Sequence, residues 1–266
     1  YSTYPMSSGA NALIELCRPV RALFTDLDGT MTSDGRLHGD TLAALYRLFA
    51  AQIPVVLVTG RPAGWGHTLA SLFPFAAVIT ENGGVSFVPE GGGFRKIYGV
   101  PDDELAEWRS RMLSATTGVI ANVPGAALSG DSVYREVDLA IDWNEEVKLS
   151  ESDADSIVGQ LIGLGFAASR SSVHVNYGPP RFTKFTASEE ILVEVFGHQR
   201  GGDLSSYVFV GDSLNDAPMF EGFPNSVGVA NVQDRWNELP HKPKYKTDAR
   251  EGAGFCELVD HLLGLD

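Results

Sequence analysis

Hydrophobic and polar positions in the first third of the chain alternate between two patterns, one typical of buried strands and one of amphipathic helices. Apolar runs of strand length occupy 20–25, 53–58 and 76–80, and apolar residues recur at helical spacing over 40–51 and 61–73. Strands and helices in this order form parallel sheets through right-handed crossovers. We therefore expect the three strands to pair in one parallel sheet.

The same alternation returns in the last third of the chain. Strands are predicted over 207–210 and 226–229, and helices over 187–196, 214–220 and 252–263. Because the two ends of the chain share one pattern, they predict a single α/β core built on a doubly wound parallel sheet.

The middle of the chain departs from this alternation. Helices are predicted over 102–116 and 151–164, a strand-like alternation over 133–141, and one or two strands over 166–176. Runs of strands and helices of this kind indicate a separate α+β layer. We expect it to be inserted between the two halves of the core.

Composition narrows the possible partners. The 266 residues carry a formal net charge of −14, which argues against binding to nucleic acid or to anionic membranes. No apolar run is long enough to cross a bilayer, so a cytoplasmic location is expected. The spacing of Cys17 and Cys256 gives no metal or redox motif, and both are expected to be buried or incidental thiols. Residues 1–5 precede Met6 and are expected to be either a remnant of expression or a natural leader, outside the fold.

The most informative polar sequence is Asp26-Leu27-Asp28-Gly29-Thr30, at the end of the first apolar run. Side chains two residues apart in extended backbone point to the same side, so the carboxylates of Asp26 and Asp28 can converge. Gly29 permits a sharp turn directly afterwards. Taken alone, the sequence also fits an ordinary turn after a buried strand.

A second motif, Thr59-Gly60-Arg61, follows the second apolar run. A hydroxyl and the backbone N–H groups at a helix start can hold phosphate oxygens, although a plain turn would have the same composition. Lys184 precedes the helix predicted from residue 187 and could neutralise nearby carboxylates. The alternative for a lone lysine is a solvated surface charge.

The strand at 207–210 runs into Gly211-Asp212-Ser213-Leu214-Asn215-Asp216. Carboxylate and amide oxygens are the ligands that Mg²⁺ prefers. Asp212 or Ser213 could instead cap the following helix, but a cap does not account for Asp216. An additional carboxylate at this strand end is costly unless a cation neutralises it, so the motif favours a metal site.

These motifs, DLDGT, TGR, Lys184 and GDSLNDAPM, occur in the order of the four motifs of the haloacid dehalogenase-like (HAD) hydrolase superfamily, which the chain resembles at both ends. The resemblance implies a Rossmann-like core formed by residues 1–88 and 182–266, with an α+β cap domain at 89–181. The large inserted cap resembles that of the class IIB sugar-phosphatase branch, which includes the Cof-type and mannosyl-3-phosphoglycerate phosphatase groups.

The resemblance also implies roles in the hydrolysis of a phosphomonoester. Asp26 is expected to attack phosphorus and form an aspartyl-phosphate, and Asp28 to act first as general acid and then as general base. Thr59 and Lys184 are expected to bind the transferring oxygens. The residues expected around Mg²⁺ are Asp26, the Asp28 carbonyl and Asp212 as ligands, with Asn215 and Asp216 orienting groups beside them.

Substrate choice is expected to lie mainly in the cap and in the loop that precedes it. The Glu81-Asn82-Gly83-Gly84 loop resembles the corresponding loop of the same branch, which implies that Asn82 faces the leaving group. The other residues expected to bind substrate are Gly60, Arg61, Arg135, His174, Asn176 and Arg181. His174 and Asn176 alternate with valines and also fit the solvent-facing side of an ordinary sheet.

Pro218-Met219 resembles the mannosyl-3-phosphoglycerate phosphatase group in particular. A substrate with sugar and carboxylate parts would need a cationic partner in the cap, and Arg135, Arg170 and Arg181 are available for this. Other sugar phosphates remain possible.

Two other functions stay open. A phosphomutase of the same superfamily shares the aspartyl-phosphate chemistry but returns the phosphoryl group to a sugar. A non-catalytic, Mg²⁺-dependent phospho-accepting or binding module would use the acidic strand ends as a switch, although Asp28 and the large insertion favour an enzyme. The expected partner is a small phosphomonoester, with neither nucleic acid nor membrane, and the oligomeric state is unknown.

Overall fold

The computed structural model describes residues 10–16, 19–171 and 173–265. The expectations for Cys17 and for residues 1–5 concern positions outside this part of the chain. The chain divides into two units, the first made of Tyr1–Val55 and Asp203–Asp266 and the second of Val56–Gly202.

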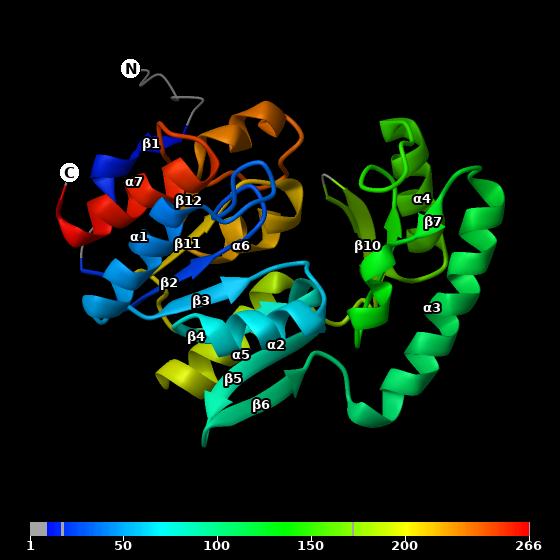
Figure 1. Ribbon diagram of the computed structural model, residues 1–266, viewed down its shortest axis with the longest axis horizontal. Coiled ribbons are helices and arrows are strands. Elements are labelled where there is room, and N and C mark those ends of the chain that lie inside the picture. The colour runs from blue at the N-terminus through cyan, green and yellow to red at the C-terminus, as the bar shows by residue number, and fades with distance from the viewer. Residues whose placement is uncertain (1–9, 17–18, 172, 266) are drawn as a thin grey trace, which may run out of the picture. The chain divides into compact units, whose positions relative to one another are not determined.

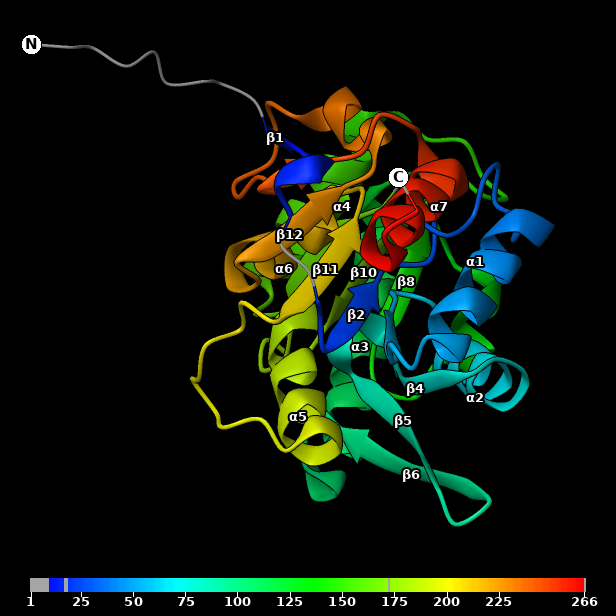
Figure 2. The same cartoon turned by 90° about the vertical axis from the view of Figure 1, so that its left-hand side faces the viewer.

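The first unit is built on a parallel sheet to which both ends of the chain contribute (Figure 1). β2 (Ala22–Thr25) pairs with β11 (Tyr207–Gly211), which pairs with β12 (Asn225–Gly228). β13 (Tyr245–Lys246) and β1 (Asn11–Ala12) extend the sheet in the same direction. Figure 2 shows β12, β11 and β2 side by side. The predicted α/β class with parallel strands is confirmed.

Helices cover this sheet because its strands are apolar on both faces. Every residue of β2 and β11 is buried, a pattern typical of parallel strands packed between helical layers. The helices of the first unit are α1 (Gly39–Ala50), α6 (Ala217–Gly222) and α7 (Glu251–Leu263). α1 packs against α7, which carries Cys256 as a half-buried free thiol.

The second unit begins with the strand–helix–strand pattern predicted from the sequence. β3 (Val55–Val58) and β4 (Phe75–Thr80) are neighbours, and α2 (Ala63–Leu72) connects them. An antiparallel hairpin of β5 (Val85–Glu90) and β6 (Gly93–Tyr98) follows β4. The sequence analysis did not predict this hairpin, which turns at two glycines with positive φ.

A separate antiparallel sheet with the order β7-β8-β10-β9 confirms the predicted α+β layer. Its strands are β7 (Ala127–Leu128), β8 (Leu139–Asp142), β9 (Ala167–Arg170) and β10 (His174–Gly178). These strands lie within the predicted cap, but the cap boundaries at 89 and 181 stay a prediction.

Two helices share a hydrophobic core with this sheet. They are α3 (Asp102–Asn122), longer than the helix predicted over 102–116, and α4 (Glu151–Gly163). Tyr177 belongs to this core, and its hydroxyl bonds to Thr116 and to the Met112 carbonyl.

Two further predicted element bounds are wrong. The strand predicted over 133–141 is confirmed only in β8, because Gly130–Tyr134 forms a 3₁₀ helix, η3. The helix predicted from residue 187 starts earlier, as α5 (Lys184–Phe196). A reciprocal capping box between Thr183 and Thr186 fixes this start, so Lys184 lies in the first turn rather than before the helix.

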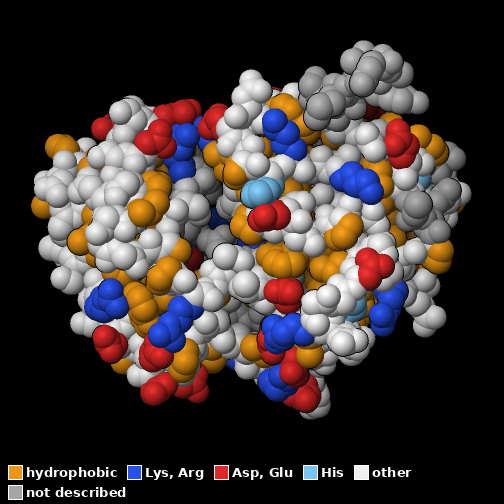
Figure 3. Space-filling view, turned by 180° about the vertical axis from the view of Figure 1, so that it is seen from behind, with side chains coloured by type: hydrophobic (Ala, Val, Ile, Leu, Met, Phe, Trp, Pro, Cys, Tyr) orange, Lys and Arg blue, Asp and Glu red, His pale blue; other side chains and the backbone are white. Residues whose placement is uncertain are grey.

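Acidic and basic side chains are intermingled on the face drawn in Figure 3, where no single basic patch stands out. Among the described residues, no helix has both the length and the apolar character that a membrane span requires.

Candidate active site

The register between β2 and β11 brings two motif aspartates to one strand end. Thr25 pairs with Val210, and the Asp26 N–H donates to the Val210 carbonyl at 2.9 Å. Asp26 and Asp212 therefore leave the carboxyl end of adjacent parallel strands at nearly the same level. This arrangement follows from the strand pairing and could not be read from residues 186 positions apart in the sequence.

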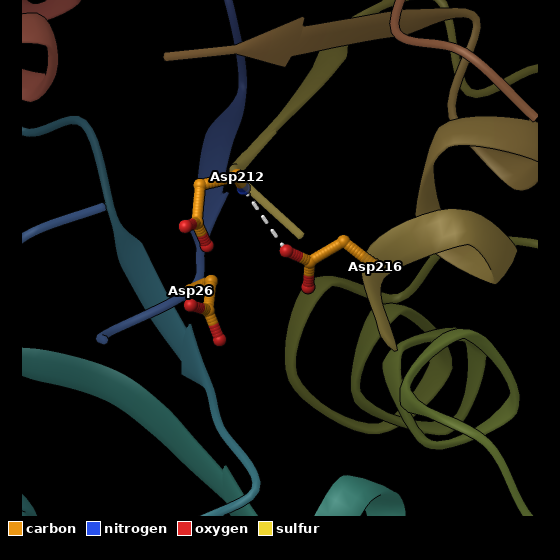
Figure 4. Close-up of side chains that lie close together, drawn as sticks. All are labelled: Asp26, Asp212 and Asp216. Carbon is orange, nitrogen blue, oxygen red and sulfur yellow. Dashed lines mark hydrogen bonds between the residues drawn. The ribbon is translucent and has the colours of Figure 1, made fainter. Parts of the chain in front are cut away.

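Asp216 joins them from the 3₁₀ turn η4 (Leu214–Asp216), and Figure 4 shows the three side chains converging. Its Oδ2 accepts hydrogen bonds from the backbone N–H groups of Asp212 at 3.0 Å and of Ser213 at 3.2 Å. A Cβ on Gly211 would lie 2.5 Å from this oxygen, so only glycine leaves room for it. Asp216 is fully buried, and its carboxylate is tied to the loop that carries Asp212.

The donor set fits a hard divalent cation. One carboxylate oxygen from each of Asp26, Asp212 and Asp216 lies within 4.8 Å of the others, and Asp26 and Asp216 are buried. Three carboxylates at this range repel one another unless a cation or hydrogen-bond donors offset their charge. An all-oxygen set of this kind suits Mg²⁺, Ca²⁺ or Mn²⁺ better than the softer transition metals.

Asp28 and Asn215, the remaining motif residues of the first unit, lie in the turns that follow β2 and β11. Asp28 is half-buried in the turn after β2, where the N–H groups of residues 30–32 all bond to the Leu27 carbonyl. Asn215 lies in η4, and its Oδ1 accepts a 2.6 Å hydrogen bond from the Ser213 hydroxyl. The roles predicted for both side chains stay predictions.

In the second unit, Thr59 and Lys184 are buried, each with about 1% of its surface exposed. The Thr59 hydroxyl accepts the Arg61 N–H at 3.1 Å, and the Thr59 carbonyl accepts the Asn82 N–H at 3.1 Å. Lys184 is not the solvated surface lysine considered as the alternative. Buried lysines need polar or anionic partners, so this burial is consistent with the neutralising role predicted for Lys184.

Two predicted substrate residues hold the loop after β3. Arg135 Nη1 donates to the Gly60 carbonyl at 3.1 Å, and Asn176 Nδ2 donates to it at 3.2 Å. Asn82 lies beside the same glycine, because a Cβ on Gly60 would be 3.1 Å from the amide groups of both Asn82 and Asn176. Residues 60, 82, 135 and 176, predicted separately from the sequence, are therefore neighbours within the second unit.

His174 and Asn176 do not face solvent, contrary to the alternative drawn from their alternation with valines. Their exposed fractions are 3% and 8%, and every residue of β10 is buried. His174 Nε2 lies 2.8 Å from Glu145 Oε2. The other oxygen of Glu145 is 3.9 Å from Arg61, which stacks over the Trp65 ring at 4.6 Å from its centroid.

Arg135 lies in a buried cluster of charges. It donates to Asp131 at 3.1 Å and to Asp138 at 2.7 Å. Burial raises the pKa of Asp138 to about 8, although Arg135 opposes the shift and the Glu81 carboxylate adds to it. By contrast, Arg181 is half-exposed and bonds Glu104 at 2.8 Å, away from these contacts.

Glu81 has a structural role that was not predicted from the sequence, where it stood only as part of the loop motif. Its carboxylate is fully buried and accepts hydrogen bonds from four backbone N–H groups at 2.6–2.9 Å. The donors are Ala63, Glu136, Val137 and Asp138. Glu81 thus connects the start of α2 to the segment that enters β8. Only its position at a strand end could have indicated this role.

A family model described as haloacid dehalogenase-like hydrolase matches residues 23–91, which include the first two motifs. The third and fourth motifs follow in the family's order, and the structure brings the aspartates of the first and fourth together. Over these residues the chain matches the haloacid dehalogenase-like hydrolases. The resemblance stated from the sequence is confirmed.

Other similar proteins align over nearly the whole chain. A phosphoglycolate phosphatase of Methanosarcina mazei is 29% identical over 248 residues, which cover 91% of this chain and 96% of the relative. The solved structure of Thermoplasma acidophilum 0175 aligns with a TM-score of 0.71 at 18% identity, covering 92% and 99% of the two chains. A HAD subclass IIB sugar phosphatase, BT4131, aligns with a TM-score of 0.63 at 18% identity, covering 92% and 100%. These two structures show that the chain shares their overall fold.

Replacing Glu81 with Gln tests the buried carboxylate. A glutamine keeps one acceptor oxygen, but its NH₂ group would face backbone N–H donors. At least one buried N–H group therefore loses its acceptor, which costs about 1–3 kcal/mol. We expect Glu81→Gln to lower the free energy of unfolding in urea by that amount or more. Glu136→Gln, which changes a half-exposed carboxylate on the same segment, serves as the control and is expected to cost less than about 1 kcal/mol. Equal losses in the two variants would contradict this role for Glu81.

The raised pKa of Asp138 predicts a pH-dependent stability. A carboxyl group whose pKa rises from 3.8 in the unfolded chain to about 8 in the fold favours folding when protonated. This contribution is present below pH 4 and is lost as the pH rises through about 8. Urea unfolding at pH 5 and pH 8.5 should therefore show a larger loss of stability in the wild type than in Asp138→Asn. Parallel pH profiles for the two proteins would show that Asp138 ionises normally.

Proposed function

We propose that this protein is a Mg²⁺-dependent phosphatase that hydrolyses a phosphomonoester through an aspartyl-phosphate on Asp26. The observation that carries the proposal is the convergence of Asp26, Asp212 and Asp216 at the carboxyl end of β2 and β11. The match of residues 23–91 to the HAD-like hydrolases and the relatives named as phosphatases support it. The cytoplasmic location and the small-molecule substrate expected from the sequence are part of the same proposal.

The carboxylate of Asp26 is the nucleophile. One of its oxygens forms a bond to phosphorus as the bond between phosphorus and the leaving-group oxygen breaks. Asp28 donates its proton to the leaving-group oxygen. Asp28 then takes a proton from a water molecule that attacks the same phosphorus. This second displacement releases inorganic phosphate and restores the Asp26 carboxylate.

An anionic substrate can approach these carboxylates only if positive charge nearby offsets their negative charge. Mg²⁺ would be held by Asp26, the Asp28 carbonyl and Asp212, and when bound it supplies positive charge for the phosphoryl oxygens. Asp216 fixes the Asp212 loop through the two N–H groups that it accepts. We assign Thr59 and Lys184 to the phosphoryl oxygens on the strength of the motif order, with their burial as support.

For the leaving group we propose an uncharged, hydroxyl-rich molecule such as a sugar. The Oδ1 atoms of Asn82 and Asn176 are buried and have no hydrogen-bond partner among the described residues. Both lie beside Gly60, and both are acceptors that a hydroxyl donor would satisfy. A leaving group rich in hydroxyls provides such donors, whereas a carboxylate does not.

The arginines near the predicted substrate residues favour the same class. A carboxylate on the leaving group would need a cation, but the chain's own carboxylates already pair with the three arginines considered from the sequence. Arg135 pairs with Asp131 and Asp138, Arg170 with Glu151 and Asp155, and Arg181 with Glu104. We therefore consider mannosyl-3-phosphoglycerate a weaker candidate substrate than the phosphates of uncharged sugars. Phosphoglycolate is the second candidate, because relatives that cover nearly the whole chain carry that name.

Asp26→Asn tests the nucleophile. The amide has nearly the volume of the carboxylate but cannot form the phosphoryl bond, so kcat should fall to the background of the assay while the fold is kept. Phosphate release in the presence of Mg²⁺ measures the loss, and product analysis separates hydrolysis from mutase activity. Asp34→Asn, an exposed aspartate of the same loop, is the control and should keep wild-type activity. Substantial phosphatase activity in Asp26→Asn would overturn the assignment.

The leaving-group class is tested by comparing kcat/KM for hexose phosphates and for phosphoglycolate. We expect the wild type to prefer the hexose phosphates, and Asn82→Ala to lower their kcat/KM by about 10- to 100-fold, since an acceptor for a substrate hydroxyl is lost. Asn122→Ala, which removes an exposed amide bonded to Gln160, is the control and should change neither value. A wild-type preference for phosphoglycolate would decide for the second candidate.

A further inference from the structure

Asn231 lies outside the four motifs but touches the residues that they bring together. It belongs to the 3₁₀ helix η5 (Ala230–Arg235), directly after β12. Its Nδ2 donates to Asp212 Oδ2 and to the Gly29 carbonyl, each at 2.9 Å. Its Oδ1 accepts the backbone N–H of Glu251 at 2.8 Å. One amide therefore connects three segments of the first unit that are far apart in the sequence.

The first contact fixes the plane of the Asp212 carboxylate. A free carboxylate rotates about its terminal bond, but an N–H donor on Oδ2 holds that oxygen in place. Gly29 lies close to the same oxygen, because a Cβ at this position would be only 2.4 Å from Asp212 Oδ2. Mutation of a group that orients a ligand in this way typically lowers metal affinity or activity by about 10- to 100-fold.

The second contact holds the loop that follows Asp28. Gly29 has a φ of +76°, and its N–H donates to the Thr32 hydroxyl at 3.0 Å while its carbonyl accepts from Asn231. The peptide groups directly after Asp28 are thus bonded on both sides. The same amide sets the distance between this loop and Asp212, since it donates to both.

The third contact anchors the amide itself. Glu251, whose N–H bonds Asn231, is the first residue of α7, and the next N–H, of Gly252, donates to the Ser33 hydroxyl at 3.2 Å. α7 carries buried residues along its length and packs against α1. Asn231 is therefore held from a long, well-packed helix rather than from a loose loop.

We propose that Asn231 is a positioning residue for the cation site, which sets the orientation of Asp212 and its distance from the Asp28 loop. This role rests on the proposed function only for the identity of the cation. The alternative is that Asn231 only caps the start of α7. That role would need only the hydrogen bond that the Glu251 N–H donates to Oδ1, and the two Nδ2 bonds would not affect the cation site. The experiment must separate these two roles.

The first measurement is a calorimetric titration of the metal-free protein with Mg²⁺ or Mn²⁺ alone. We expect Asn231→Ala to raise the dissociation constant about tenfold or more, and Asp212→Ala, which removes a ligand, to raise it further. Asn225→Ala is the matched control, because this buried amide of β12 donates to the Ser205 carbonyl and does not touch the site. Its metal affinity should stay within twofold of the wild type, even if its melting temperature falls.

The second variant, Asn231→Asp, keeps an oxygen that caps Glu251 and almost the same volume, but it replaces both N–H donors with a carboxylate oxygen that repels Asp212 Oδ2. If Asn231→Ala fails to fold, this variant decides. We expect its kcat at saturating Mg²⁺ to fall about tenfold or more, with the melting temperature of the magnesium-bound protein little changed.

Either of two results would overturn the positioning role. One is a metal dissociation constant within twofold of the wild type in Asn231→Ala, with only a lower melting temperature. The other is wild-type kcat and metal affinity in Asn231→Asp. Because the titration needs no substrate, a wild-type protein that binds Mg²⁺ but hydrolyses no phosphomonoester would refute the proposed function and leave the positioning role to the titration alone.

Discussion

The mutual repulsion of three carboxylates at one strand end is the constraint on which the rest of this structure depends. Each pair of unit charges 4 Å apart at a partly buried position repels by about 4 kcal/mol. The register of β2 against β11 makes this approach unavoidable, because it sets Asp26 and Asp212 at the same level. Backbone N–H groups bind Asp216 and an amide binds Asp212, and a divalent cation would offset the remaining charge. The repulsion that would destabilise the fold thus defines a cation site.

In the second unit, buried charges are offset by hydrogen bonds and ion pairs within the chain. Glu81 accepts four backbone N–H groups, and Arg135 bonds two aspartates and the Gly60 carbonyl. Glu81 and Arg135 are thus paired within the chain, and Arg135 also bonds the loop after β3. The two amide oxygens beside Gly60, on Asn82 and Asn176, have no such partner. These two neutral acceptors are the groups that we propose for binding the substrate.

The fold and the motif residues could be predicted from the sequence because their signals are local. Apolar runs gave β2, β3, β4 and β11 to within two or three residues, and DLDGT and GDSLND are continuous in the chain. Glu81 and Asn231 could not be predicted, since their partners come from segments about 20–200 positions away. His174 and Asn176 show the same limit, because alternation with valines tells which side of a strand a residue occupies but not whether another layer covers that side.

Phosphorylation of Asp26 is the step on which the proposed function depends most directly. Wild-type protein turning over a hexose phosphate with Mg²⁺ can be quenched in acid, reduced with borohydride to convert an aspartyl-phosphate to homoserine, and mapped by mass spectrometry. The account predicts homoserine at position 26 only when substrate and Mg²⁺ are both present. Turnover with unmodified Asp26, or with modification at another carboxylate, would contradict it.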